Sequence, residues 1–126
     1  FRPDKAFFVD RPSLLNPWLN QLGENIITFA DFLSALKARH DYFHEKGCRL
    51  TDHGMRYALS NPCKESEADQ ILAKVREGQA ANPEETDAFG ALIMYHLGQW
   101  VSETDWTMQL HLGPRRNPNT RLFQKK

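Results

Sequence analysis

The sequence predicts an α/β protein that is mainly helical and carries two short parallel strands. Three observations predict this class. Gly and Pro residues divide the chain into short blocks, most blocks repeat apolar residues every three or four positions, and two blocks are short extended runs. Their order is helix, strand, helix, helix, strand, which is typical of βα units around a parallel sheet. Two strands cannot make that sheet alone, so either the chain is a mainly helical piece or a longer parent supplies the missing strands.

The first helical region is expected at about residues 10–46. In its first half, Asn16-Pro17 is typical of a helix start, with Asn as the cap and Pro in the first turn. The second half begins at Thr28, which forms a capping-box pattern with Asp31, and a glycine ends it. Its apolar stripe consists of Phe29, Phe32, Leu33, Leu36, His40 and Phe43.

An extended run at about residues 48–53 follows too closely on the glycine to be another helix, so we expect a short strand that leads into a loop. Helices are then expected at about residues 66–104. The longer of them begins at Pro83, with Asn82 as its cap. Its apolar residues recur at helical spacing: Phe89, Leu92, Ile93, His96 and Trp100.

The last strand is expected at about residues 106–112, followed by a loop at 113–126. Apolar and polar residues alternate along this run, which is typical of a strand with two different faces. We expect Gln109 and His111 to project to the polar side. On the other side, three residues are expected to pack against helices: Met108, Leu110 and Leu112.

Composition narrows the classes of partner. The chain has 126 residues, 40% of them hydrophobic, with 16 basic and 16 acidic side chains and a formal charge of zero. This balance gives no electrostatic footprint for nucleic acid or an anionic membrane. No apolar run approaches the roughly 20 residues of a membrane helix, and Cys48 and Cys63 lack metal-type spacing. We therefore expect both cysteines to be free thiols in a cytoplasmic protein. The first residue is Phe1 and not Met, which suggests that the sequence is a piece of a longer protein.

Four stretches together resemble the uronate isomerases, the amidohydrolase-like barrel family that interconverts glucuronate with fructuronate and galacturonate with tagaturonate. They are residues 1–6 (FRPDKA), 32–43, 47–54 (GCRLTDHG) and 106–119. The resemblance implies that the chain is an internal fragment of a (β/α)8 TIM barrel. It also implies an aldose-ketose isomerase acting in carbohydrate metabolism.

The last stretch is the most specific, because in the family it reads Gln-x-His-Ile/Leu-Gly followed by Arg-Asn-Asn-Asn. Here Gln109 and His111 match the first part and Arg116 begins the second, but Pro118 stands where the family has Asn. The family's metal-binding His-x-His and Asp lie in regions that this sequence does not contain. The resemblance thus implies a divalent metal ion, expected to be zinc, in the intact parent and none bound to this fragment.

The implied reaction moves a proton between C2 and C1 through an enediol, which requires an acid-base group, an electrophile and cations for the substrate carboxylate. His111 is the candidate catalytic residue, as a proton relay or an oxygen-polarising group. We do not carry metal ligation over to it. The alternative is a buried histidine hydrogen-bonded to a neighbouring strand.

The candidate substrate-binding residues lie at or just after the expected strands, within the stretches that resemble the family. They are Arg2, Asp52, His53, Gln109 and Arg116. A guanidinium suits bidentate capture of a carboxylate, although Arg2 could instead form a structural salt bridge with Asp4. Asp52 and His53 either face the pocket or form an Asx-turn and a satisfied histidine. Arg116 either holds a substrate oxygen or pairs with an acidic residue.

Three functions remain open. The first is part of a uronate isomerase, inactive alone, whose partners are a uronic acid and the rest of the barrel. Assembly of the parent into a homo-oligomer is left open. The second is a helical interaction or oligomerisation module, which an exposed apolar stripe on either long helix would mark. The third is a fragment of a metal-dependent amidohydrolase-type hydrolase. His40, His44 and His96 are expected to be structural, because no Glu follows His40 as a metalloprotease motif requires.

Overall fold

A computed structural model describes residues 1–23 and 25–113, so the expected loop at 113–126 and Arg116 lie outside the described residues except for Gly113. The described part is mainly helical with two parallel strands, as the sequence predicts. The elements are η1 (Asp4–Asp10), α1 (Pro12–Leu22), α2 (Phe29–Glu45), β1 (Leu50–Met55), α3 (Glu65–Arg76), α4 (Pro83–Glu103) and β2 (Thr107–Leu112). None of the described helices is both long enough and apolar enough to cross a membrane.

The two long helices begin where their capping residues predict. Thr28 Oγ1 accepts from the Asp31 N–H at 3.1 Å, and the Asp31 carboxylate accepts from the Thr28 N–H at 2.8 Å. Asn82 and Glu85 repeat this reciprocal arrangement at the start of α4. Each pair satisfies backbone N–H groups that have no partner inside the helix, so the local sequence fixes both starts.

The predicted start of α1 at Asn16-Pro17 is wrong, because the helix begins at Pro12 and both residues lie inside it. Pro12 suits the first turn, where its missing N–H costs nothing. Asn16 instead uses its side chain to donate a hydrogen bond of 2.8 Å to the Val75 carbonyl. A residue that resembled a cap therefore ties α1 to α3.

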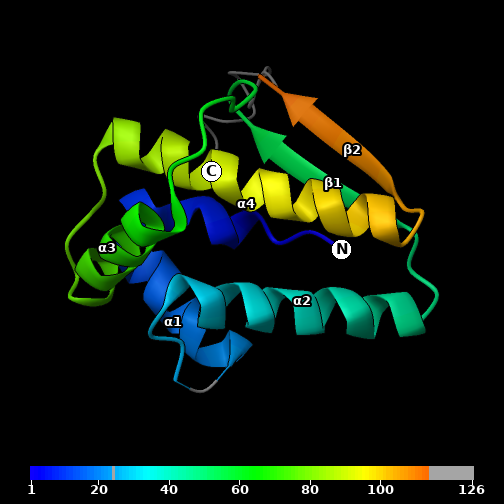
Figure 1. Cartoon of the computed structure of the whole chain (residues 1–126), viewed down its shortest axis with the longest axis horizontal. Helices are drawn as coiled ribbons and strands as arrows, with labels where there is room; N and C mark the ends of the chain where they lie inside the picture. Colours follow the sequence, from blue (N-terminus) through cyan, green and yellow to red (C-terminus); the bar gives the residue numbers. More distant parts are fainter. Residues whose placement is uncertain (24, 114–126) are drawn as a thin grey trace, which may run out of the picture.

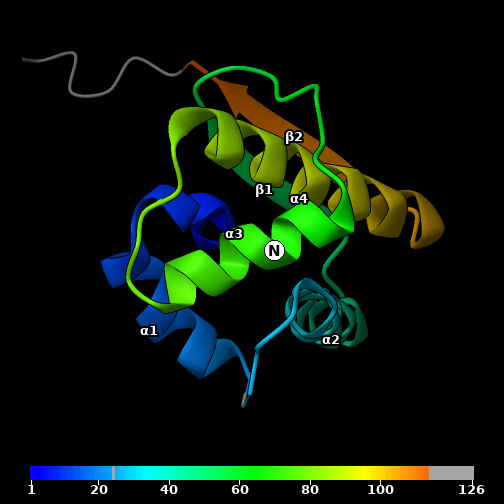
Figure 2. The same cartoon turned by 60° about the vertical axis from the view of Figure 1, so that its left-hand side comes forward.

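Strands β1 and β2 pair in parallel over six residues, and α3 and α4 connect them. Figures 1 and 2 show the two strands side by side along one side of α4, with α1, α2 and α3 on its other side. β1 begins at Leu50, two residues later than expected. Gly47 has a φ of +88°, and the Cys48 N–H still donates back to the Phe43 carbonyl at 2.9 Å. The residues before Leu50 therefore complete the end of α2.

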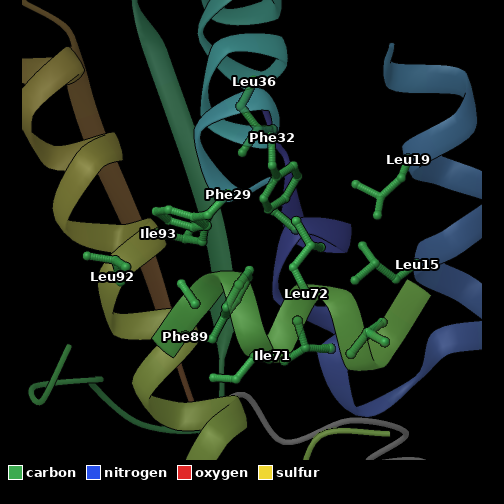
Figure 3. Packing of buried hydrophobic residues seen from close by; sticks show 14 of the residues in the cluster. Leu15, Leu19, Phe29, Phe32, Leu36, Ile71, Leu72, Phe89, Leu92 and Ile93 are labelled. Carbon is green, nitrogen blue, oxygen red and sulfur yellow. The ribbon is translucent and has the colours of Figure 1, made fainter. Parts of the chain in front are cut away.

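The apolar stripes of α2 and α4 are buried against each other. The Phe32 and Phe89 rings stack with centroids 6.2 Å apart, and Phe29 meets Phe89 edge to face at 5.5 Å. Figure 3 shows Leu72 of α3 and Leu15 of α1 pointing into the same space. Most of the apolar stripe on each long helix is therefore buried in the core and is not available to a partner. This weakens the interpretation of the helices as a docking module.

The apolar side of β2 is less covered than expected. Met108 packs against the core, but Leu110 and Leu112 are 44% and 48% exposed. The expectation that all three residues pack against helices is therefore wrong in the described structure. The core that packs against Met108 does not extend to these two side chains.

The aromatic contact between α2 and α4 should dominate the stability of the fold. We expect Phe89→Ala to lower the free energy of unfolding by about 3–5 kcal/mol, because it empties a fully buried ring position. Urea unfolding followed by circular dichroism measures the change. Leu14→Ala is the control, since Leu14 is 49% exposed and its loss should cost under about 1 kcal/mol. Equal losses in both variants would contradict this account of the core.

Candidate functional site

Three extended segments bring polar residues together, and the first is the opening of the chain. The Phe1 backbone N donates to the Leu50 carbonyl at 2.9 Å, and the Asp52 N–H donates to the Phe1 carbonyl at 3.1 Å. These two bonds form a parallel bridge on the edge of β1 that does not face β2. The bridge places Arg2 beside the outer face of β1.

Polar side chains from these segments form a continuous row. Arg2 Nε donates to Asp4 Oδ2 at 2.8 Å, and Arg2 Nη1 lies 3.2 Å from Asp52 Oδ2. The other Asp52 oxygen is 2.6 Å from His111 Nδ1, and His111 Nε2 is 3.3 Å from Gln109 Nε2. We call this set the polar row; its members are Asp4, Arg2, Asp52, His111 and Gln109.

The register of the sheet explains why the row forms. Asp52 is paired with Gln109, and Gly54 is paired with His111. Partners in a parallel ladder share a face of the sheet, so these residues lie on the same side. Because Gly54 has no side chain, the imidazole of His111 has room to reach Asp52. Three of the predicted site residues thus come together from two strands.

Charge and hydrogen bonding define the chemical state of the row. An ionised Asp52 can only accept, so His111 Nδ1 carries the hydrogen and its Nε2 is left with a lone pair. The hydrogen bond from Arg2 to Asp4, followed by the charges of Asp4 and Asp52, raises the pKa of Arg2. In such an arrangement the histidine can move a proton, and the neighbouring arginine can bind an anion.

The alternatives for these residues are partly realised. Arg2 does pair with Asp4, but it contacts Asp52 as well and its side chain is 52% exposed. Asp52 lies within β1 and contacts Arg2 and His111, so it is not an Asx-turn residue. His111 does bond a neighbouring strand, yet its side chain is 47% exposed. Each residue therefore keeps surface that a ligand can reach.

His53 lies apart from the polar row, on the opposite face of β1. It is fully buried, its Nε2 is 2.7 Å from Thr51 Oγ1, and its ring meets Phe7 edge to face. Successive strand residues point to opposite sides, so the neighbour of an outward Asp52 must point inward. This position does not support direct contact between His53 and a substrate.

The other histidines are structural, as expected. His40 is 1% exposed and packs on Trp106 with ring centroids 4.2 Å apart, while His44 Nδ1 accepts from Trp106 Nε1 at 2.9 Å. Among the described residues no three His, Cys, Asp or Glu side chains are placed to hold a metal ion. In the polar row, the nearest approach to such a set is Asp52 with His111, and they bond each other. The described residues therefore do not fit a metal site on their own.

A cavity of about 550 Å³ adjoins the polar row between η1, α4 and the segment after β1. Tyr57 Oη donates to Asp87 Oδ2 at 2.5 Å across its wall, and Asp4 and Gly54 line the side toward the row. No local pattern in the sequence predicts this wall. Its signal was weak, because Tyr57 and Asp87 are 30 residues apart and belong to no recognisable motif.

The burial of His53 makes stability depend on pH. Burial lowers the pKa of His53 below its ordinary value of 6.5, against the opposing charges of Asp4 and Asp52. The unfolded chain therefore binds this proton at higher pH than the folded chain. The stabilisation is complete above about pH 6.5 and is lost as the pH falls toward the lower pKa of the folded state.

We therefore expect the urea midpoint to drop between about pH 7.5 and pH 5. The drop should be smaller in a folded His53→Gln variant, because glutamine does not titrate there. Equal drops in the two proteins would show that other groups cause the acid sensitivity.

Comparisons with known proteins agree on one family. A family model described as glucuronate isomerase matches residues 1–126. The uronate isomerases of Solibacter usitatus and Opitutus terrae are each 47% identical to the chain, over 99% and 98% of its length. The solved uronate isomerase of Thermotoga maritima has a TM-score of 0.85 at 30% identity, covering 98% of this chain. The glucuronate isomerase of Caulobacter crescentus, with a TM-score of 0.75 at 23% identity over 98% of this chain, shares the fold.

The chain spans only part of these relatives: 28% and 27% of the two curated proteins, and 28% and 26% of the two solved chains. The resemblance noted in the sequence is nevertheless confirmed along its whole length. Because the family model covers every residue from 1 to 126, this chain belongs to the glucuronate isomerase family.

Proposed function

We propose that the protein carrying this chain is a uronate isomerase, which converts D-glucuronate to D-fructuronate and D-galacturonate to D-tagaturonate. Membership of the family supports the reaction class. The observation that carries the proposal is the polar row. In it Arg2, which can bind the carboxylate of a substrate, and His111 both contact Asp52. The relatives are named as isomerases, which favours this function over hydrolysis.

Within this proposal Arg2 binds the substrate carboxylate. Its Nε is committed to Asp4 and its Nη1 to Asp52, which holds the guanidinium plane in place. The side chain is 52% exposed, so its remaining N–H groups can donate to an incoming anion. Gln109 and Arg116 would bind substrate oxygens.

His111 moves the proton between carbon atoms. With Nδ1 bonded to Asp52, its Nε2 lone pair takes the proton from C2 of the open-chain aldose, and the hydroxyl proton on O2 passes to O1 through the enediol. The imidazolium then returns its proton to C1, which gives the ketose. Asp52 stabilises the imidazolium that exists between the two transfers. Gln109 must release Nε2 for this step, because its amide lies 3.3 Å from that nitrogen.

The remaining parts of the proposal concern the rest of the protein. The paired strands β1 and β2 fit two neighbouring strands of a (β/α)8 barrel, whose sites form at the carboxyl ends of the strands. A divalent metal would need ligands from outside the described residues. Alone, the chain is expected to be inactive. The free Cys48 and Cys63 fit a cytoplasmic enzyme.

Substitution of Arg2 tests carboxylate binding in the enzyme that carries this chain. We expect Arg2→Met to lower kcat/KM for glucuronate about 10- to 150-fold, the equivalent of about 1.5–3 kcal/mol for hydrogen bonds to a charged group. Arg2→Lys should recover part of the loss, because it keeps the charge without the fork. Arg76→Met is the control, since Arg76 is an exposed guanidinium on α3. A kcat/KM for Arg2→Met equal to that of the control argues against this role.

Substitution of His111 tests proton transfer. We expect His111→Ala to reduce kcat about 10²- to 10⁴-fold, the usual contribution of a positioned acid-base group. A coupled assay of ketose formation measures kcat, and exchange of the C2 proton in D₂O should fall in parallel. A folded His44→Ala enzyme should keep its kcat, because within residues 1–23 and 25–113 the His44 imidazole bonds Trp106 and not the polar row. Undiminished exchange in His111→Ala would assign the proton to another group.

A further inference from the structure

The face of β1 opposite the polar row holds a buried pair whose purpose the proposed reaction does not explain. We propose that Thr51 and His53 are positioning residues, which hold the peptide between Phe1 and Arg2 so that Arg2 stays in place against Asp52. The inference rests on the proposed function, because it gives the pair a role in presenting Arg2 to the substrate carboxylate. Neither residue would touch the substrate.

A short path of hydrogen bonds connects the pair to Arg2. His53 Nε2 lies 2.7 Å from Thr51 Oγ1, and Thr51 Oγ1 donates to the Phe1 carbonyl oxygen at 3.1 Å. That carbonyl belongs to the peptide group that leads into Arg2. The hydroxyl therefore acts on the backbone of Arg2 at the point where the chain leaves its bridge with β1.

The hydrogen inventory permits one consistent arrangement. A threonine hydroxyl has a single hydrogen, which here goes to the Phe1 carbonyl, so the hydroxyl must accept from His53. His53 must then carry its hydrogen on Nε2 and be bare at Nδ1, which is buried without a partner among the described residues. Thr51 and His53 are both 0% exposed, so water does not compete with these bonds. A neutral imidazole in that position gives the hydroxyl one orientation.

The electrostatic surroundings favour that neutral form. The negative charges of Asp4 and Asp52 act to raise the pKa of His53, and the positive charge of Arg2 acts to lower it. Burial outweighs the two carboxylates and lowers the pKa of His53.

The position of the Arg2 side chain depends on how firmly the Phe1 carbonyl is held. The Phe1 carbonyl accepts from both the Asp52 N–H and the Thr51 hydroxyl, each at 3.1 Å. One bond comes from the residue that Arg2 must face, and the other comes from the buried pair. With the second bond gone, the peptide can rotate about the first, and Arg2 then moves from the position in which it meets the substrate carboxylate.

Thr51→Val and Thr51→Ser are the matched test, made in the enzyme that carries this chain. Valine keeps the shape and removes the hydroxyl, while serine keeps the hydroxyl. We expect Thr51→Val to raise KM for glucuronate about tenfold with kcat changed less than about threefold, since misplaced Arg2 weakens binding in ground and transition states alike. Thr51→Ser should retain the wild-type KM. Equal KM values in both variants and the wild type would overturn the inference.

The wild-type enzyme separates this inference from the proposed function. If it does not isomerise glucuronate or galacturonate, the proposed function fails whatever Thr51 does. If it is active and the valine variant does not fold, folded His53→Gln and His53→Leu provide the same comparison, because the glutamine amide can still donate to Thr51. If His53→Leu keeps the wild-type KM, then Thr51 and His53 do not position Arg2.

Nitrogen chemical shifts of His53 in the wild-type enzyme give a readout that needs no substitution. The arrangement requires hydrogen on Nε2 and a bare Nδ1 at about pH 7.5. Observation of the other tautomer, or of the imidazolium, would mean that Thr51 cannot receive the bond and would overturn the proposal independently of activity.

Discussion

The register of β1 against its two neighbours is the constraint on which the rest of the structure depends. Asp52 is opposite Gln109, and the Phe1 carbonyl accepts the Asp52 N–H on the other edge. A slip of one residue along either edge would send the outward side chains inward. The polar row exists only in the observed register, because its members come from segments that are about 50 residues apart or more.

The same register separates two kinds of polar residue that adjoin in the sequence. Asp52 points outward, where its charge meets Arg2 and His111 and retains some contact with solvent. His53 points inward, where burial favours an uncharged imidazole bonded to Thr51. Burying an ionised carboxylate would cost far more than burying a neutral ring, so the order Asp-His, rather than His-Asp, suits this strand. The charged side chain of Asp52 and the neutral ring of His53 thus lie on opposite faces of one sheet.

The helices hold this register in place. The stacked rings of Phe32 and Phe89 fix α2 and α4 to one another, and α4 lies along the sheet (Figure 2). The core that the helices share with η1 includes Ala6 and Val9, so the segment that follows Arg2 is anchored as well. Leu110 and Leu112 are the part of the sheet that this core leaves open, which fits a chain that spans 28% of its curated relative.

Local sequence determined much of this protein by itself. The capping boxes at Thr28 and Asn82, the alternation along β2 and the motif around His111 predicted the long helices, the last strand and a candidate residue of the polar row, because each is read over a few neighbouring residues. Asn16 misled for the same reason, since its partner Val75 lies far along the chain. Only the tertiary structure decided that Asp52 joins Arg2 and His111 while His53 turns away. Pairing between distant segments sets the register, and register has no local signature.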